Sequence, residues 1–163
     1  MGFDDYFLPN PPAPEIHNGE FQFEIVYAIN GKQYTLSDIF VCKYQGVEMH
    51  GGGVLGGKGE KRRLWTGYIK STGEKELVLY KDDKIKLYCE LGAPGYYMGD
   101  KNYADDSEAK IYLEDSKRRF NYALEKEDIK ELYDTEIINF EISKPIENEF
   151  RYTIKSIFAW PKR

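Results

Sequence analysis

The sequence predicts a mainly β protein, an antiparallel β-sandwich or irregular barrel of about nine strands with one short helix near residues 125–133. Residues 21–29 alternate between apolar and polar side chains almost without interruption, which is typical of a strand with one buried face. Asn30-Gly31 follows directly, and this pair accepts the positive φ angles of a type I′ hairpin turn. Aromatic residues make up 15% of the chain, and large rings pack well on a pleated sheet.

Length and charge limit the classes of function. A chain of 163 residues with 41% hydrophobic residues can bury a core as one domain. Lys and Arg number 23 against 28 Asp and Glu, a formal net charge of −5, so phosphate backbones are not generally attracted. No run of 18 apolar residues occurs, which predicts no membrane-spanning helix. We expect no cofactor and no nucleic-acid partner.

Residues 1–19 are predicted to form a Pro-rich leader or spacer, followed by a single β domain over residues 20–163. Prolines at positions 9, 11, 12 and 14 prevent a helix and favour an extended polyproline II segment. Such a segment is either a stiff spacer or lies across the body of the domain. The first residues contain no basic region followed by an apolar one, so no signal peptide is expected.

The first hairpin has a register that a two-residue turn determines. Tyr34 then falls opposite Tyr27, and Asp38 falls opposite Phe23, on the apolar face. An aspartate at this position leaves two alternatives. With a β-bulge near Asp38, the inward residues are Ile39 and Val41. Without a bulge, Asp38 lies at the rim and the inward residues are Phe40, Cys42 and Tyr44.

Short turns separate the remaining predicted strands. These strands cover residues 64–70, 76–80, 85–91, 109–114, 119–124, 136–143 and 150–158. The glycine-rich segment 46–59 is predicted to be a long flexible hairpin loop. The helix near residues 125–133 has acidic residues in its first turn, where the helix dipole favours them. In the strand 136–143, the residues predicted to form the apolar face are Ile138, Phe140 and Ile142.

The glycine-rich segment also matches two nucleotide-binding patterns in part. Residues 51–56 satisfy G-x-G-x-x-G, and residues 52–58 satisfy most of a P-loop. Both patterns depend on a helix that begins after the loop, whereas charged residues and a strand follow here. We therefore interpret the segment as a surface loop. The basic residues at its end are interpreted as solvated, and they are Lys58, Lys61, Arg62 and Arg63.

One loop concentrates oxygen-bearing side chains and forms a candidate calcium site, because Ca²⁺ prefers oxygen ligands. The candidate ligands are Asp100, Asn102, Asp105 and Asp106. The EF-hand pattern fails, since Ala104 occupies its third ligand position and Ile111 occupies the position of the bidentate glutamate. The alternative is a solvated acidic turn.

Candidate ligand-binding residues come from the same region together with one tryptophan. They are Trp65, Tyr96, Tyr97 and Asp100. No motif of a serine, metal-dependent or cysteine hydrolase is present, so no catalytic residue is assigned and an enzyme is not expected. The alternative is a carbohydrate- or peptidoglycan-active enzyme that uses two carboxylates, since the spacing of such a pair is not visible in sequence.

Two cysteines, Cys42 and Cys89, lie inside predicted strands. One interpretation is a pair of buried thiols that pack as small apolar residues. The other is a disulfide between them, which would close a long loop. Their spacing matches no zinc motif. The alternation of residues 85–91 predicts that Cys89 points into the core.

Several segments together resemble small, uncharacterised surface proteins of Gram-positive bacteria. They are the Pro-rich entry, the strand 20–30 that ends on Asn-Gly, and residues 38–46 and 95–100. In that group an N-terminal membrane helix or lipoprotein signal usually precedes the β domain. The resemblance implies a non-enzymatic, extracytoplasmic binding or scaffolding domain that is anchored at the cell surface. It further implies that the partner is a cell-envelope protein or glycan and that residues 3–19 are a juxtamembrane spacer.

Overall fold

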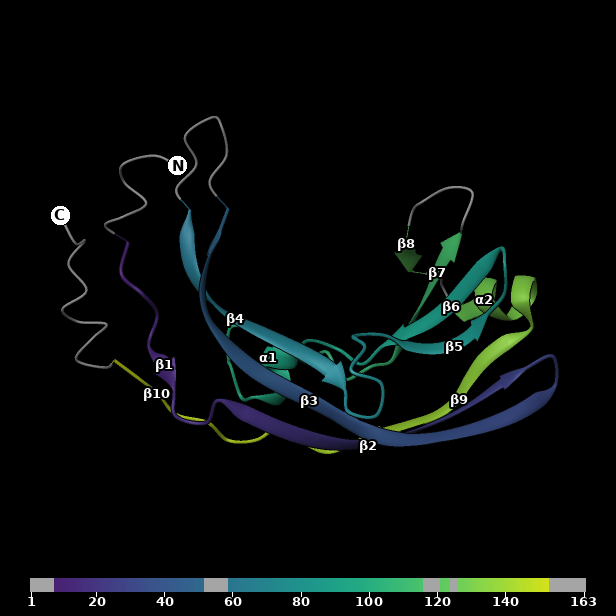
Figure 1. Ribbon diagram of the computed structural model, residues 1–163, viewed down its shortest axis with the longest axis horizontal. Coiled ribbons are helices and arrows are strands. Elements are labelled where there is room, and N and C mark those ends of the chain that lie inside the picture. Colours follow the sequence, from purple (N-terminus) through teal and green to yellow (C-terminus); the bar gives the residue numbers. More distant parts are fainter. Residues whose placement is uncertain (1–7, 52–58, 116–120, 124–125, 153–163) are drawn as a thin grey trace.

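The computed structural model describes residues 8–51, 59–115, 121–123 and 126–152. It confirms a mainly β, antiparallel fold in which one sheet curls into a half-barrel. The described residues form two four-stranded sheets, a pair of two-residue strands and two short helices. The half-barrel has a convex outer side, and its concave side holds one helix and the second sheet (Figure 1).

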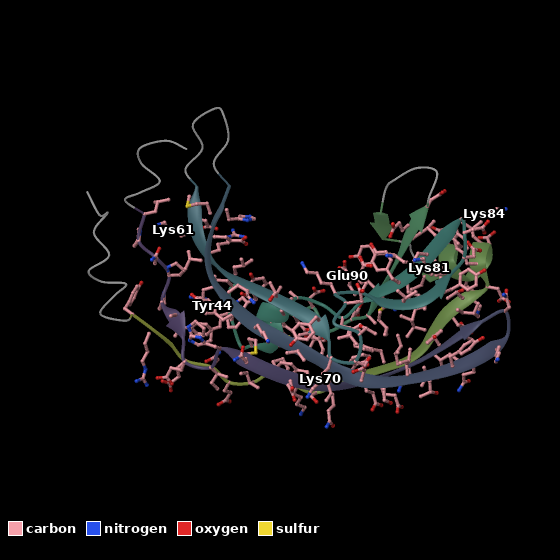
Figure 2. All side chains as sticks on the ribbon, in the orientation of Figure 1. Tyr44, Lys61, Lys70, Lys81, Lys84 and Glu90 are labelled. Carbon is pink, nitrogen blue, oxygen red and sulfur yellow. The ribbon has the colours of Figure 1, made fainter. Side chains whose placement is uncertain are left out.

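The curled sheet has the strand order β4-β3-β2-β9. A long hairpin of β2 (Asn18–Ile29) and β3 (Lys32–His50) forms its centre. The outer strands are β4 (Glu60–Ile69) and β9 (Thr135–Ile142). Charged side chains project from the convex side, where the ammonium of Lys70 lies 2.8 Å from a carboxylate oxygen of Glu20 (Figure 2).

The second sheet has the strand order β5-β6-β7-β8. Its strands are β5 (Leu77–Lys81), β6 (Ile85–Glu90), β7 (Lys110–Asp115) and β8 (Asn121–Ala123). Between β6 and β7 the chain forms the one-turn helix α1 (Pro94–Tyr97), and between β8 and β9 it forms α2 (Lys126–Tyr133). The boundaries of α2 agree closely with the predicted helix.

The register of the first hairpin is the one that a two-residue turn predicts. Asn30 and Gly31 both have positive φ, 51° and 77°. Tyr27 pairs with Tyr34, and no register shift occurs along the β2–β3 pair. The alternative without a bulge is therefore correct, and Phe40 and Cys42 are buried on the inner face.

The strand β3 extends further than predicted. It continues to His50, which pairs with Glu60 of β4, so residues 46–50 belong to the sheet and not to a loop. A bulge between Tyr44 and Val47 interrupts the pairing, and Gly46 there has a φ of 101°. Residues 52–58, which carry most of the partial nucleotide-binding patterns, lie outside the described residues.

The predicted apolar face of β9 is wrong at one position. The β2–β9 register shifts between Val26 and Tyr27, so Ile138 is an extra residue without a partner in the pairing. Ile138 is consequently half exposed, and Ile137 packs against the core in its place. Phe140 and Ile142 face inward as predicted. Period-two alternation cannot reveal a bulge, because the inserted residue reverses the phase.

Part of the Pro-rich leader lies against the body of the protein. β1 (Ala13–Pro14) pairs with β10 (Phe150–Arg151) in the antiparallel sense. The amide of Glu15 also donates a hydrogen bond to the carbonyl of Glu149, at 2.8 Å. Residues 13–15 are thus ordered on the last described strand. Only the first two residues of the predicted strand 150–158 are strand in the described part of the chain.

One core fills the space between the two sheets and α1. It contains the inner faces of β2, β3 and β4 and the apolar faces of β5, β6 and β7. Helix α1 contacts β3 and β4 closely because glycine leaves room for it. A β-carbon added at Gly67 would lie 2.5 Å from the Phe40 ring and 2.9 Å from the ring of Pro94.

We expect Gly67→Ala to destabilise the protein by about 1–3 kcal/mol, because overpacking a filled core forces side chains out of their rotamers. Urea denaturation followed by tryptophan fluorescence measures this change. Thr35→Ala, on an exposed position of β3, is the control and should shift the free energy of unfolding by less than about 0.5 kcal/mol. Equal stability of the Gly67 variant and the wild type would contradict the close approach of α1.

Candidate functional site

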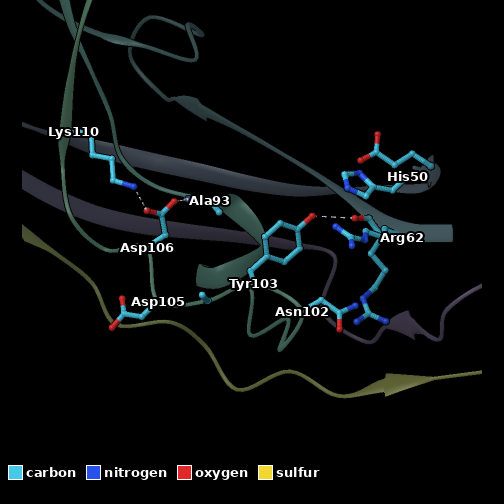
Figure 3. A pocket seen from close by; sticks show the side chains of 11 residues that line it. His50, Arg62, Ala93, Asn102, Tyr103, Asp105, Asp106 and Lys110 are labelled. Atoms are coloured by element: carbon cyan, nitrogen blue, oxygen red, sulfur yellow. Dashed lines mark hydrogen bonds and ion pairs between the residues drawn. The ribbon is translucent and has the colours of Figure 1, made fainter. Parts of the chain in front are cut away.

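A cleft of about 560 Å³ is lined by residues from both four-stranded sheets (Figure 3). Its volume falls within the range of small-molecule sites, about 300–1,000 Å³. One wall comes from the paired ends of β3 and β4, and the other comes from β7 and the loop that follows α1. The lining residues are Glu48, His50, Arg62, Arg63, Ala93, Asn102, Tyr103, Ala104, Asp105, Asp106 and Lys110.

A buried ion pair lies beneath the cleft. Arg63 on β4 and Asp100 after α1 are only 7% and 2% exposed. Nε and Nη2 of Arg63 each donate a hydrogen bond to a different oxygen of Asp100, both at 2.7 Å. The indole N–H of Trp65 donates a further bond to the same carboxylate, at 2.9 Å. Such two-pronged arginine–carboxylate contacts are strong and directional.

The guanidinium of Arg63 also contacts both ends of the described chain. Its Nη1 donates a hydrogen bond to the carbonyl of Pro12, at 3.0 Å. Its central carbon lies 4.3 Å from the ring centre of Phe150, a cation–π contact. One side chain therefore joins the leader, β4, the loop after α1 and β10.

The ion pair keeps both partners charged. Burial by itself raises the pKa of Asp100. Hydrogen bonds from Arg63, Trp65 and the backbone N–H of Asn102 have the larger, opposite effect and hold that pKa below its ordinary value. The bonds to Asp100 raise the pKa of Arg63, although burial opposes this. A buried charge is tolerated when it is paired and fully hydrogen-bonded.

Tyr103 forms the floor of the cleft. Its hydroxyl donates a hydrogen bond to the backbone carbonyl of Arg63, at 3.2 Å. Its ring lies directly on α1, since a β-carbon added at Gly95 would approach two of its ring carbons to 2.5 Å. The ring is thus held at its hydroxyl end and along one side (Figure 3).

The charged groups around the rim are partly paired with one another. The ammonium of Lys110 lies 3.0 Å from one carboxylate oxygen of Asp106. The other oxygen of Asp106 accepts a hydrogen bond from the backbone N–H of Ala93. Arg62 forms an ion pair with Glu60. In contrast, the side chains of Glu48, His50 and Asn102 make no hydrogen bond or ion pair with any described residue. As far as the described residues extend, these three groups are available to a ligand.

The structure brings together two of the predicted ligand-binding residues, but it buries them. Trp65 and Asp100 are bonded to each other in the layer below the cleft. Tyr97 is fully buried, and its hydroxyl donates to the carbonyl of Leu91 at 2.6 Å. None of these three residues, nor Tyr96, lines the cleft that the described residues form. Trp65 and Asp100 support the layer beneath the cleft, whereas Tyr97 packs in the core against Phe21 and Phe40.

The candidate calcium ligands turn toward separate partners. Asp100 is bonded to Arg63 and Asp106 to Lys110, while Asp105 accepts a hydrogen bond from the hydroxyl of Ser107 at 2.8 Å. Asn102 reaches the cleft instead. Within the described ranges no three acidic, histidine or cysteine side chains form a group that could hold a metal ion.

Both cysteines are buried free thiols. Cys42 on β3 and Cys89 on β6 each have no exposed surface. Cys89 points into the core as the strand alternation predicts, and Cys42 does so because the first hairpin has no bulge near Asp38. Burial raises the pKa of both thiols to about 12, with Glu90 adding to the effect at Cys89. The thiolate is the reactive form, so neither group is reactive near neutral pH.

Sequence reasoning singled out Asn102, Asp105 and Asp106, as candidate calcium ligands, and these three line the cleft, but it missed the roles of the other lining residues. Arg63 was interpreted as part of a solvated basic patch, and this is wrong because its guanidinium is buried on Asp100. The glycine-rich pattern predicts a loop at Glu48 and His50, whereas β3 continues through both residues. Their period-two spacing and the matching charged residues from Glu60 onward were the available signal for an extended hairpin. No comparable signal marked Tyr103.

No protein-family model matches this chain, and neither a curated protein nor a solved structure matches it. The described residues form an antiparallel half-barrel with a cleft lined by both of its four-stranded sheets. In the described part of the chain no helix is both long and apolar enough to span a bilayer.

Asp100→Asn should destabilise the protein by about 3–5 kcal/mol near neutral pH, because it leaves Arg63 buried without its carboxylate. The pKa of Asp100 is lower in the folded protein than the value of about 3.9 in the unfolded chain. Its ionisation therefore stabilises the folded state when the pH is above about 3.9, and this stabilisation is lost as the pH falls through the folded-state pKa. The wild type should therefore lose more stability than the variant between about pH 7 and pH 3.

Urea denaturation at several pH values measures this difference. Asp83→Asn, in an exposed turn, is the matched control and should retain the wild-type acid response. Parallel stability curves for the wild type and Asp100→Asn would show that the ion pair contributes nothing to acid sensitivity.

We expect neither thiol to react with Ellman's reagent in the native protein near neutral pH, and both to react after denaturation without reductant. The physical reason is that burial excludes the reagent and suppresses the thiolate. Absorbance of the released chromophore gives the thiol count. A denatured, unreduced sample without reactive thiols, and lighter than the reduced protein by two hydrogens, would instead establish the disulfide.

Proposed function

We propose that this protein is a non-enzymatic, extracytoplasmic binding or scaffolding domain of the cell envelope, and that the cleft over Tyr103 is its binding site. The observation that carries the proposal is the contrast between a rigid floor and free polar groups at the rim. The floor rests on the Arg63–Asp100 pair. The free groups are the side chains of Glu48, His50 and Asn102 within the described part of the chain.

Rigid support favours binding because little conformational freedom is lost when a ligand arrives. Tyr103 and Asp100 come from one loop. The backbone N–H of Asn102, in the same loop, donates a hydrogen bond to the Asp100 carboxylate at 3.1 Å. The same carboxylate that holds Arg63 thus also fixes the backbone of a residue at the rim. Binding sites commonly combine such preformed walls with a few convergent polar groups.

The acidic residues of the cleft support binding over catalysis. A general acid in glycoside hydrolysis needs a raised pKa. At Asp105, hydrogen bonds from Ser107 and Tyr96 lower the pKa, and burial opposes them only weakly. Asp106 is tied to Lys110 and to the backbone amide of Ala93. A carboxylate-dependent hydrolase remains the alternative, and the experiment below separates the two.

The envelope assignment rests on the resemblance of the Pro-rich entry, the first hairpin and residues 95–100 to Gram-positive surface proteins. The position of β1 is compatible with it. β1 and β10 lie side by side at one end of the molecule (Figure 1). A protein anchored through residues before β1 would be held at that end, and its convex sheet and second sheet would remain accessible.

The proposal is tested by sedimentation of the protein with purified Gram-positive cell-wall sacculi. We expect the wild type to co-sediment and the double variant Glu48→Gln/His50→Ala to remain largely in the supernatant, because two free polar groups of the rim are lost. Loss of two hydrogen bonds corresponds to about a tenfold or greater weakening. The supernatant is also assayed for released reducing sugars and amines.

Glu131→Gln is the control for the charge change, since Glu131 is exposed on α2, outside the cleft lining. It should sediment as the wild type does. Absence of wild-type sedimentation, or equal sedimentation of the double variant, would refute the proposal. Release of fragments by the wild type but not by the double variant would establish the hydrolase instead.

A further inference from the structure

We infer that the ligand of the cleft is a neutral saccharide, with one pyranose ring lying on Tyr103 and its hydroxyl groups bonded to Glu48, His50 and Asn102. This inference rests on the proposed binding function and specifies its ligand.

The first reason is the way in which Tyr103 is held. Its hydroxyl is bonded to the Arg63 carbonyl, and one side of its ring rests on the backbone at Gly95. The ring therefore offers a flat apolar surface whose orientation is set before a ligand binds. The C–H groups of a pyranose form a matching flat apolar face. An aromatic ring with one polar end suits a ligand that is apolar on one face and polar at its edges.

The second reason is the chemistry of the free rim groups. A carboxylate accepts hydrogen bonds, an amide both donates and accepts, and a neutral imidazole has one donor and one acceptor. Neighbouring sugar hydroxyls each donate and accept, so they can satisfy Glu48, His50 and Asn102 together. Among the described lining residues, the apolar side chains besides Tyr103 are the small ones of Ala93 and Ala104. The described lining thus offers no large aliphatic side chain to a ligand.

The third reason is the balance of charge. Within the described residues each cation of the cleft has a carboxylate partner: Arg62 with Glu60, Arg63 with Asp100, and Lys110 with Asp106. The lining holds three carboxylates, Glu48, Asp105 and Asp106, against these three cations. Its charges therefore balance and every cation is already paired, so an anionic ligand such as a phosphate or uronic acid gains no net attraction.

A peptide that adds a strand to the sheet is disfavoured at the same place. β4 is an outer strand, and strand addition uses the backbone groups of such an edge. Here the carbonyl of Arg63 already accepts the hydroxyl proton of Tyr103, and the tyrosine ring lies beside the strand at this point. An incoming strand would have to displace the floor of the cleft.

The inference is tested by titrating ¹⁵N-labelled protein with chitotriose, cellotriose and maltotriose, with trigalacturonic acid and trilysine as charged probes. We expect at least one neutral trisaccharide to shift the amide signals of Asn102 and Tyr103, and both charged probes to leave them unchanged. Tyr103→Ala should weaken this binding about tenfold, because the apolar contact is lost. Tyr103→Phe retains the ring and should bind within about threefold of the wild type.

Asn102→Ala should also weaken binding, whereas Asn18→Ala on the exposed start of β2 should not. Both asparagines are exposed, so this pair tests the site even if Tyr103→Ala does not fold. Trilysine binding in the cleft without saccharide binding would overturn the inference and leave the binding function standing. Sedimentation with sacculi that depends on Glu48, combined with no response to any neutral trisaccharide, would also overturn it. Failure of sedimentation as well would remove the proposed function itself.

Discussion

A buried arginine joins the parts of this protein that the chain separates. The guanidinium of Arg63 donates two hydrogen bonds to Asp100 and one to the carbonyl of Pro12, and it packs against the ring of Phe150. Arginine suits this position because its planar group can form several directed contacts while remaining charged. Because the charge is buried, its carboxylate partner becomes necessary: removing Asp100 leaves Arg63 as an unpaired buried ion.

The cleft follows from this constraint. The loop after α1 is held through Asp100, and the same loop carries Asn102 and Tyr103 to the surface. β4 is held through Arg63, and its carbonyl in turn orients Tyr103. Gly67 on β4 lets α1 approach the sheet closely, and Gly95 on α1 lets the ring of Tyr103 approach that helix. The floor is therefore stabilised by polar contacts from below and by close packing from the side.

The curled sheet has two outer strands, and each is modified in a way that limits pairing with another chain. In β9 the bulge at Ile138 breaks the regular row of backbone groups, and bulges of this kind protect sheet edges. On β4 the side chain of Tyr103 occupies a backbone acceptor of the edge. The half-barrel thus remains open without presenting a long, regular edge, and the modification on β4 also forms part of the cleft.

The sequence alone determined the local features of this protein. Alternation and the Asn-Gly pair predicted the first hairpin, its pairing near the turn and the inward direction of Cys89, since strand geometry and turn conformation depend on neighbouring residues. The direction of Cys42 stayed open between two registers until the structure showed an unbroken β2–β3 pairing. Tertiary structure decided the bulge that exposes Ile138, the burial of Arg63 and the meeting of Tyr103 with the ends of β3 and β4. These features depend on residues far apart in the chain: Arg63 resembles a solvated loop residue until Asp100, Pro12 and Phe150 surround it.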